Sequence, residues 1–205
     1  MVLKRSILRK ALSGICDFKD DRLFVIPMLS RITEDDVGNV SLDLRLGRWF
    51  LTLQQSSRTK LDFFETQEMS DPFLARKDFI RFDNQYVLHP NRFVLGATLE
   101  WIRVPTSCAG SIVGKSSLGR HGLIIETAPV VHPGFSGCLT LELANVGEVP
   151  IALRPGMEIA QLQISRAEGI GAGAGRFKGY RRPTLGTVRR DDVQVRLVRG
   201  KYRNG

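Results

Sequence analysis

The sequence predicts a mainly β protein with one short helix near its amino end, and three observations lead to this prediction. The first is a change of apolar period, from helical spacing in residues 3–15 to two-residue alternation in residues 41–47. The second is a series of short apolar or alternating segments separated by glycine, proline and asparagine turns. The third is the lack of helical patterns between those segments, which favours an antiparallel sandwich, jelly roll or barrel.

The elements follow from these patterns in chain order. A helix is expected in residues 3–15, where Gly14 is a suitable C-terminal stop. In residues 41–47, Leu42 and Leu44 alternate with polar residues, as in a half-buried strand. Residues 55–85 are polar and weakly periodic, so no local structure is assigned to them. Further strands are expected within residues 93–104, 110–114, 123–131, 138–146, 150–155 and 158–164.

The length and charge suggest one folded domain followed by an arm. A chain of 205 residues is the size of a single domain. Glycines at 169, 171, 173 and 175 mark a flexible break, so we expect a domain in residues 1–168 and a hinge with a basic arm in residues 169–205. The net charge is +9, and ten of the 30 lysines and arginines lie in the arm after Gly175. Such a tail suits a polyphosphate ligand, nucleic acid or solubility alone.

Composition excludes several classes. No apolar run approaches the roughly 20 residues of a membrane helix. The amino terminus also lacks a secretory signal, so we expect a cytoplasmic protein. The three cysteines show no CxxC spacing and the three histidines show no HExxH spacing. Neither a disulfide framework nor a protein-bound metal site is therefore expected.

One strand presents a candidate catalytic carboxylate. In the segment CLTLELANV, residues 138–146, Leu141 and Leu143 point to one face and Glu142 points to the other. The leucine face is expected to be core. A carboxylate beside small residues in a partly desolvated pocket suits alternate action as base and acid. The alternative is a glutamate that faces solvent on a half-exposed sheet.

A glycine-rich loop precedes that strand. The segment GKSSLGRHGL, residues 114–123, offers free backbone amides, two hydroxyls and the cations Lys115 and Arg120. These are the donors that a triphosphate needs. The loop is no Walker A motif, so an ordinary polar turn is the alternative. The segment HPGFSG, residues 132–137, is read as a turn between strands.

Taken together, GKSSLGRHGL, TAPVVHPGFSG and CLTLELANVGEVPIALRPGMEIAQLQI closely resemble the dCTP deaminase family. This family is a branch of the dUTPase-like superfamily of trimeric distorted β-barrels. The resemblance covers roughly residues 36–165 and is strongest in residues 86–164. It implies a distorted jelly-roll or β-barrel fold and a homotrimer with shared active sites. It also implies hydrolysis of dCTP to dUTP and ammonia without zinc, with Mg2+ carried by the triphosphate.

The resemblance also implies roles for individual residues. Glu142 matches the general base and acid, Ser116 and the carbonyl of Ala128 match the groups that hold the attacking water, and Arg120 matches the arginine that orients the carboxylate. Lys115 and the loop amides match the phosphate contacts, and the backbone of Thr140 and Leu141 matches the groups that read the pyrimidine edge. The complete set of implied nucleotide contacts is Lys115, Ser117, Leu118, Gly119, His132, Thr140, Leu141, Gln161, Lys178 and Tyr180, the last two in the arm that closes over the triphosphate.

One departure from the family pattern bears on the product. Val131 and His132 stand where members usually carry I-D, and in the related dUTPases that aspartate helps to activate the water that attacks the phosphate. This departure favours dUTP as the product over a bifunctional reaction that continues to dUMP, although His132 retains the ability to contact a sugar hydroxyl. A third alternative is a catalytically weak relative that senses nucleotides or binds nucleic acid through its basic tail. The expected binding partner is the nucleotide dCTP, and neither nucleic acid nor a membrane is expected.

Overall fold

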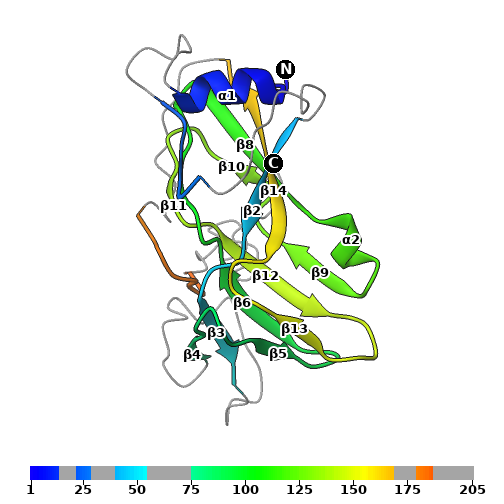
Figure 1. Ribbon diagram of the computed structural model, residues 1–205. Coiled ribbons are helices and arrows are strands. Elements are labelled where there is room, and N and C mark those ends of the chain that lie inside the picture. The colour runs from blue at the N-terminus through cyan, green and yellow to red at the C-terminus, as the bar shows by residue number, and fades with distance from the viewer. Residues whose placement is uncertain (14–21, 29–39, 55–74, 169–178, 187–205) are drawn as a thin grey trace, which may run out of the picture.

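The structure is a computed structural model that describes residues 1–13, 22–28, 40–54, 75–168 and 179–186 of the chain (Figure 1). Its helices and strands are, in chain order, α1 (Arg5–Ser13), β1 (Phe24–Ile26), β2 (Ser41–Arg45), β3 (Trp49–Leu53), β4 (Ala75–Phe79), β5 (Tyr86–Leu88), β6 (Phe93–Ala97), β7 (Trp101–Arg103), β8 (Cys108–Gly114), α2 (Ser116–Gly119), β9 (Leu123–Glu126), β10 (Val130–Val131), β11 (Ser136–Gly137), β12 (Thr140–Asn145), β13 (Ile151–Leu153) and β14 (Glu158–Arg166).

The described strands form four antiparallel sheets. Their strand orders are β1-β7-β11, β10-β8-β14-β2, β4-β3-β6-β12-β9 and β13-β5. Figure 1 shows α1 across one end of the molecule, beside the sheet of β8 and β14, and the five-stranded sheet at the other end. The prediction of a mainly β fold with a short N-terminal helix is confirmed. Among the described residues the sheets stay separate and do not close into one barrel.

The first core lies under α1. Leu3 and Leu8 are buried and pack in one cluster with Leu42 and Leu44 of β2. The amide of Leu3 also donates a hydrogen bond of 2.8 Å to the carbonyl of Ile164, which ties the chain start to β14. The helix expected within residues 3–15 is therefore present, and its apolar side chains pack on this core. No helix in the described part of the chain is long and apolar enough to cross a membrane.

The second core lies under the five-stranded sheet. Leu141 and Leu143 of β12 are fully buried there together with Phe50 of β3. Phe50 stacks on Tyr86 with ring centroids 4.8 Å apart. A bulge between Glu158 and Ala160 shifts the pairing of β14 with β2. The strand β14 contributes to both cores, to the second through Ile159 and Ala160 and to the first through Leu162 and Ile164.

Two segments that were predicted as single units are divided in the structure. Residues 93–104 form β6 and β7, which belong to different sheets. At the bend between them, the Thr98 hydroxyl donates to the carbonyl of Glu100 at 2.8 Å and accepts from the amide of Leu139 at 2.9 Å. Residues 123–131 divide in the same way into β9 and β10. Polar residues lie at both breaks, Thr98 and Glu100 in the first segment and Thr127 in the second, but alternation alone did not show that the chain changes sheets there.

The stretch left unassigned in residues 55–85 contains a strand. Residues 55–74 lie outside the described part, but β4 begins at Ala75 and pairs along its whole length with β3. The strand β5 follows and pairs with β13. Charged side chains occupy three of the five β4 positions, because this strand lies at the edge of its sheet.

Glu100 is a buried acid that the sequence analysis did not identify. It is 1 % exposed, and its carboxylate accepts the amide of Arg45 at 2.9 and 3.2 Å. Burial raises the pKa of Glu100 above its ordinary value, against the hydrogen bond from Arg45, which lowers it. The folded protein therefore binds a proton on Glu100 more tightly than the unfolded chain does. The stabilising contribution of this group is complete below the ordinary pKa and is lost as the pH rises through the raised pKa.

We expect Glu100→Gln to flatten the pH dependence of stability. Glutamine carries no charge at any pH. The free energy of unfolding of the variant should therefore fall less than that of the wild type when the pH rises from 4.5, the ordinary pKa of glutamate, to neutrality. Urea-induced unfolding at both pH values measures this difference. Leu143→Ala is the control, since its cavity should cost about 2–5 kcal/mol at either pH. Equal pH dependence in Glu100→Gln and wild type would contradict the assignment.

Candidate functional site

Glu142 occupies the centre of β12, which pairs with β6 on one side and with β9 on the other. Its chain neighbours Leu141 and Leu143 are fully buried, whereas Glu142 is exposed on the opposite face of the sheet. The prediction that the leucine face of this strand is core is confirmed. Because β12 is paired on both sides, the backbone that carries the carboxylate is fixed.

A second carboxylate lies beside the first. Glu126 of β9 is paired directly with Glu142, and both residues are exposed. Directly opposed residues of an antiparallel ladder share one face, with Cβ atoms roughly 4.5–5.5 Å apart. Like charges at this spacing repel, so the fold gains no stability from the pair. Sequence analysis did not identify Glu126 as a neighbour of Glu142, because the register of β9 on β12 is not encoded in either segment alone.

A cavity of about 600 Å3 opens on the same side of the five-stranded sheet. Ala97, one of its lining residues, is paired with Thr140, two residues before Glu142. Trp49 and Phe79 are paired across β3 and β4 and contact each other with ring centroids 4.8 Å apart. The complete lining is Ile26, Gly47, Arg48, Trp49, Phe79, Ala97, Thr98, Leu99, Trp101, Cys138 and Arg181. This mixture of aromatic rings and guanidinium groups suits a ligand with a planar ring and negative charge.

Cys138 forms part of the cavity wall. Burial raises the pKa of its thiol to about 11, although the positive charge of Arg181 acts in the opposite direction. The sulfur therefore stays protonated near neutral pH. It is a small, weakly polar wall and not a nucleophile.

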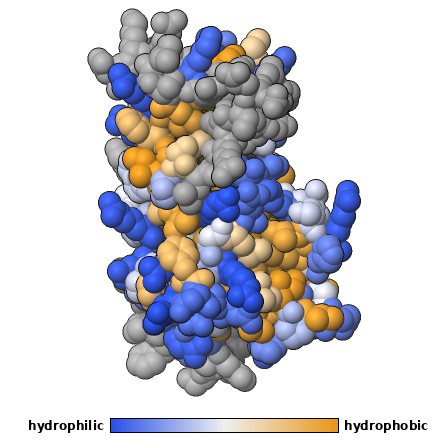
Figure 2. Space-filling view, in the orientation of Figure 1, coloured by the Kyte–Doolittle hydropathy of each residue, from blue (hydrophilic) through white to orange (hydrophobic). Residues whose placement is uncertain are grey.

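The predicted loop forms a single helical turn. The carbonyl of Lys115 accepts the amides of Leu118 and Gly119 at 3.0 and 3.1 Å, and α2 follows directly after β8. Ser116 and Arg120 are both exposed at this turn. The space-filling view in Figure 2 shows hydrophilic residues that project at the side of the molecule where α2 lies in Figure 1. The loop therefore presents polar groups from a defined backbone.

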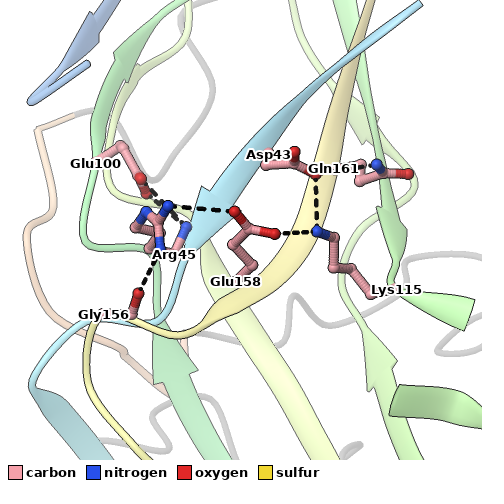
Figure 3. Close-up of polar contacts among 7 residues, drawn as sticks. All are labelled: Asp43, Arg45, Glu100, Lys115, Gly156, Glu158 and Gln161. Atoms are coloured by element: carbon pink, nitrogen blue, oxygen red, sulfur yellow. Dashed lines mark hydrogen bonds and ion pairs between the residues drawn. The ribbon is translucent and has the colours of Figure 1, made fainter. Parts of the chain in front are cut away.

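Lys115 itself does not project with the rest of the loop. Its ammonium lies 3.1 Å from Asp43 and also contacts the carboxylate of Glu158 (Figure 3). Burial by itself lowers the pKa of Lys115, but the hydrogen bonds to Glu158 and Asp43 outweigh burial and raise the pKa above its ordinary value. Lys115 therefore stays charged and paired. Gln161, a predicted nucleotide contact, is likewise occupied, since its amide nitrogen donates to Asp43 at 3.0 Å.

The remaining predicted contacts are spread along neighbouring segments. Ala128 and His132 are exposed between β9 and β11. The Thr140 carbonyl accepts the hydroxyl of Thr127 at 2.8 Å, and the side chain of Leu141 lies in the core. Any reading of a pyrimidine edge by Leu141 would therefore use its backbone, as the resemblance implies.

A described part of the arm lies against the domain. The amide of Gly179 donates to the carbonyl of Ser136 at 2.6 Å, and the carbonyl of Tyr180 accepts the amide of Cys138 at 2.8 Å. The guanidinium of Arg182 lies 4.1 Å from the ring centroid of Trp49. Residues 179–186 thus bring cations to the edge of the cavity. Lys178, the other predicted arm contact, lies outside the described residues.

The predicted catalytic residues divide into two groups in one chain. Within the part that the structure describes, no hydrogen bond or ion pair joins Ser116 or Arg120 to Glu142. The described residues also contain no group of three or more His, Cys, Asp or Glu side chains arranged for a metal ion. The strand β9 connects the loop with the Glu142 strand, since it contacts α2 and pairs with β12.

Comparison with known proteins places these features in a family. A model described as dCTP deaminase-like matches residues 19–167. A protein of Corynebacterium jeikeium named "dCTP deaminase, dUMP-forming" is 43% identical over 152 residues, which cover 70% of this chain and 79% of that protein. A protein of Nocardia farcinica with the same name is 39% identical over 171 residues, covering 80% and 82%.

A solved structure agrees with the fold. The 2'-deoxycytidine 5'-triphosphate deaminase from Agrobacterium tumefaciens superposes with a TM-score of 0.56 at 20% sequence identity. The match covers 81% of this chain and 48% of the other, so this chain spans about half the length of that protein. At this identity the likeness supports a shared fold alone. With the family model matching most of its length, the chain belongs to the dCTP deaminase-like family.

Proposed function

We propose that this protein hydrolyses dCTP to dUMP, ammonia and pyrophosphate in two successive reactions. The observation that carries the proposal is the position of Glu142, exposed at the centre of a strand that is paired on both sides. The aromatic and arginine-lined cavity opens on the same face of the sheet, although Glu142 is not one of its lining residues. The volume of about 600 Å3 falls in the range of small-molecule sites. The relatives named above support the choice of substrate and product.

The sequence-based prediction that the reaction ends at dUTP is wrong. Relatives from Corynebacterium jeikeium, Nocardia farcinica and Kocuria rhizophila, 39–43% identical to this chain, are all named as dUMP-forming. The prediction that dUTP is hydrolysed only weakly to dUMP rested on His132, because the family usually carries aspartate there. One substitution at an exposed turn was too little evidence against the bifunctional alternative, which these relatives favour.

Deamination requires one water and one proton carrier. In the proposed step Glu142 takes a proton from water as the oxygen bonds to C4 of cytosine, and then passes it toward the departing amine. The C4–N bond breaks, ammonia leaves and dUTP remains. Ser116 and the carbonyl of Ala128 hold the water, and Arg120 orients the carboxylate. The arrangement needs no zinc, since the carboxylate supplies the base.

The second step consumes another water. The proposed attack breaks the bond between the α and β phosphates of dUTP and releases dUMP and pyrophosphate. Mg2+ enters bound to the triphosphate and balances its charge. His132, in the exposed turn before β11, is the side chain that we propose to orient this water.

The division of the site favours an oligomer. Among the described residues of one chain, no hydrogen bond or ion pair joins Ser116 or Arg120 to Glu142. We therefore propose that a second copy, within a homotrimer, brings its loop to the Glu142 strand. Apolar side chains at least one-third exposed beside that strand, Phe93 and Ile124, are available to the neighbouring copy.

Product analysis tests the proposed reaction directly. Incubation of dCTP with Mg2+ should release one ammonia and one pyrophosphate for each dUMP formed. Anion-exchange chromatography with parallel ammonia and pyrophosphate assays measures this ratio. Accumulation of dUTP without pyrophosphate would contradict the second step, and no turnover of dCTP would contradict the whole proposal.

Glu142→Gln should abolish deamination and leave the second step in place. Loss of the proton carrier is expected to lower ammonia release by roughly 10²–10⁴-fold. The same variant supplied with dUTP should still form dUMP, because that step does not use C4. Glu148→Gln, in the exposed turn after β12, is the matched control and should behave as wild type. Normal ammonia release by Glu142→Gln would exclude the carboxylate as the base.

His132→Ala should have the opposite effect. Without the side chain that orients the second water, dUMP formation from dUTP should fall by roughly 10²-fold while ammonia release from dCTP continues. His89→Ala, at another exposed turn, is the control. Steady-state rates with each nucleotide measure the effect. If His132→Ala and His89→Ala form dUMP at the same rate, a group other than His132 orients the second water.

A further inference from the structure

The aromatic side of the cavity lies too far from Glu142 to hold the base that reacts there. In the five-stranded sheet, Trp49 lies two strands away from Glu142 and two residues further along, and Phe79 lies one strand beyond Trp49. With strands roughly 4.8 Å apart and a rise of roughly 3.3 Å per residue, the two rings are anchored roughly 12 Å and 16 Å from Glu142. A cytosine whose C4 reaches Glu142 therefore does not stack on these rings, and dCTP has no second ring.

The cavity has its own set of residues. None of the described residues assigned to catalysis or to dCTP belongs to its lining. Three of its lining side chains are aromatic, namely Trp49, Phe79 and Trp101. The rings of Trp49 and Phe79 are tilted by 54° with their centroids 4.8 Å apart. Aromatic faces of this kind bind flat rings by stacking.

Two guanidinium groups, those of Arg48 and Arg181, line the same cavity. The Arg48 guanidinium lies 4.2 Å from the ring centroid of Phe79 and 4.8 Å from that of Phe82. Its Nε donates to the carbonyl of Ile80 at 3.4 Å. These contacts hold the group in place but do not neutralise its charge. No carboxylate among the described residues pairs with Arg48 or Arg181.

Backbone contacts of the arm bring Arg181 to the cavity. Figure 1 shows the described arm segment, in orange, beside the start of β3. The residue before Arg181 is tied to the domain, since the Tyr180 carbonyl accepts the amide of Cys138 at 2.8 Å. On the other side, the Arg182 guanidinium lies 4.1 Å from the ring centroid of Trp49. Arg181 is therefore held between two anchored neighbours.

The cavity wall does not repel a negative ligand. Its described lining contains no aspartate or glutamate. Glu100 is close enough to act on the thiol of Cys138, but it is 1 % exposed and accepts the amide of Arg45 at 2.9 Å. The lining thus presents two positive charges beside three aromatic rings. This combination recognises a flat ring that carries about two negative charges.

We propose that this cavity is a second binding site, separate from the dCTP site, and that it takes a nucleoside monophosphate. The base stacks on the tryptophan rings, and the phosphate, with about two negative charges, is balanced by Arg48 and Arg181. A cavity of about 600 Å3 has room for one such molecule. This site goes beyond the reaction at Glu142 and does not depend on it.

Tryptophan fluorescence tests the binding, because the chain contains two tryptophans and both line the cavity. The probes are AMP and UMP, one purine and one pyrimidine, and neither contains cytosine. At least one of them should quench the fluorescence saturably, with one molecule bound per chain. The corresponding nucleoside and inorganic phosphate should each bind at least about ten-fold more weakly, because each lacks half of the contacts. No saturable quenching by either AMP or UMP would overturn the proposal.

Charge variants locate the bound molecule. Arg48→Gln and Arg181→Gln should each raise Kd for the nucleoside monophosphate by roughly 10–100-fold. Arg181 is exposed, so its replacement should leave thermal unfolding unchanged. Arg154→Gln, an exposed arginine outside the cavity, is the matched control and should bind as wild type. Equal Kd in all four proteins would mean that the molecule binds elsewhere and would overturn the assignment.

Steady-state kinetics with dCTP show whether the two sites are separate. Neither AMP nor UMP should raise KM for dCTP, and Arg181→Gln should keep kcat and KM for dCTP unchanged. Competition with dCTP, together with a raised KM in Arg181→Gln, would make the cavity part of the substrate site and overturn the proposal. A wild type that does not turn over dCTP would contradict the proposed function alone, since the fluorescence titration does not use the reaction.

Discussion

The pairing of β14 with β8 on one side and β2 on the other is the constraint on which the rest of the structure depends. The strand contributes apolar side chains to both cores, so it connects the end covered by α1 with the five-stranded sheet. Its bulge brings Glu158 and Gln161, three residues apart, to Arg45 and Asp43 of β2. The same seam then holds Lys115, and through it the start of the loop.

The five-stranded sheet imposes a second constraint. Burial of its leucine face forces Glu142 to the opposite face, and pairing with β9 places Glu126 beside it. Both carboxylates are exposed on that face, so solvent screens the charge of each from the other.

Much of the fold was accessible to sequence analysis because it follows local periodicity. Alternation in residues 138–146 identified the buried face of β12, and helical spacing in residues 3–15 identified α1. The breaks inside residues 93–104 and 123–131 were not predicted, since polar residues within a strand-like segment do not by themselves show that the chain changes sheets. Buried Glu100 was missed for a related reason: its partner Arg45 lies 55 residues away in the chain.

The sequence by itself determined the class of fold, the face of its strand to which Glu142 points and the polar loop that begins at Lys115, because each depends on neighbours within a few residues. Only the tertiary structure decided that Lys115 faces two carboxylates and that Glu126 lies opposite Glu142. It also decided which aromatic and arginine side chains line the cavity. These arrangements depend on strand register and on the bulge in β14, and register is set by packing between segments that are distant in the chain.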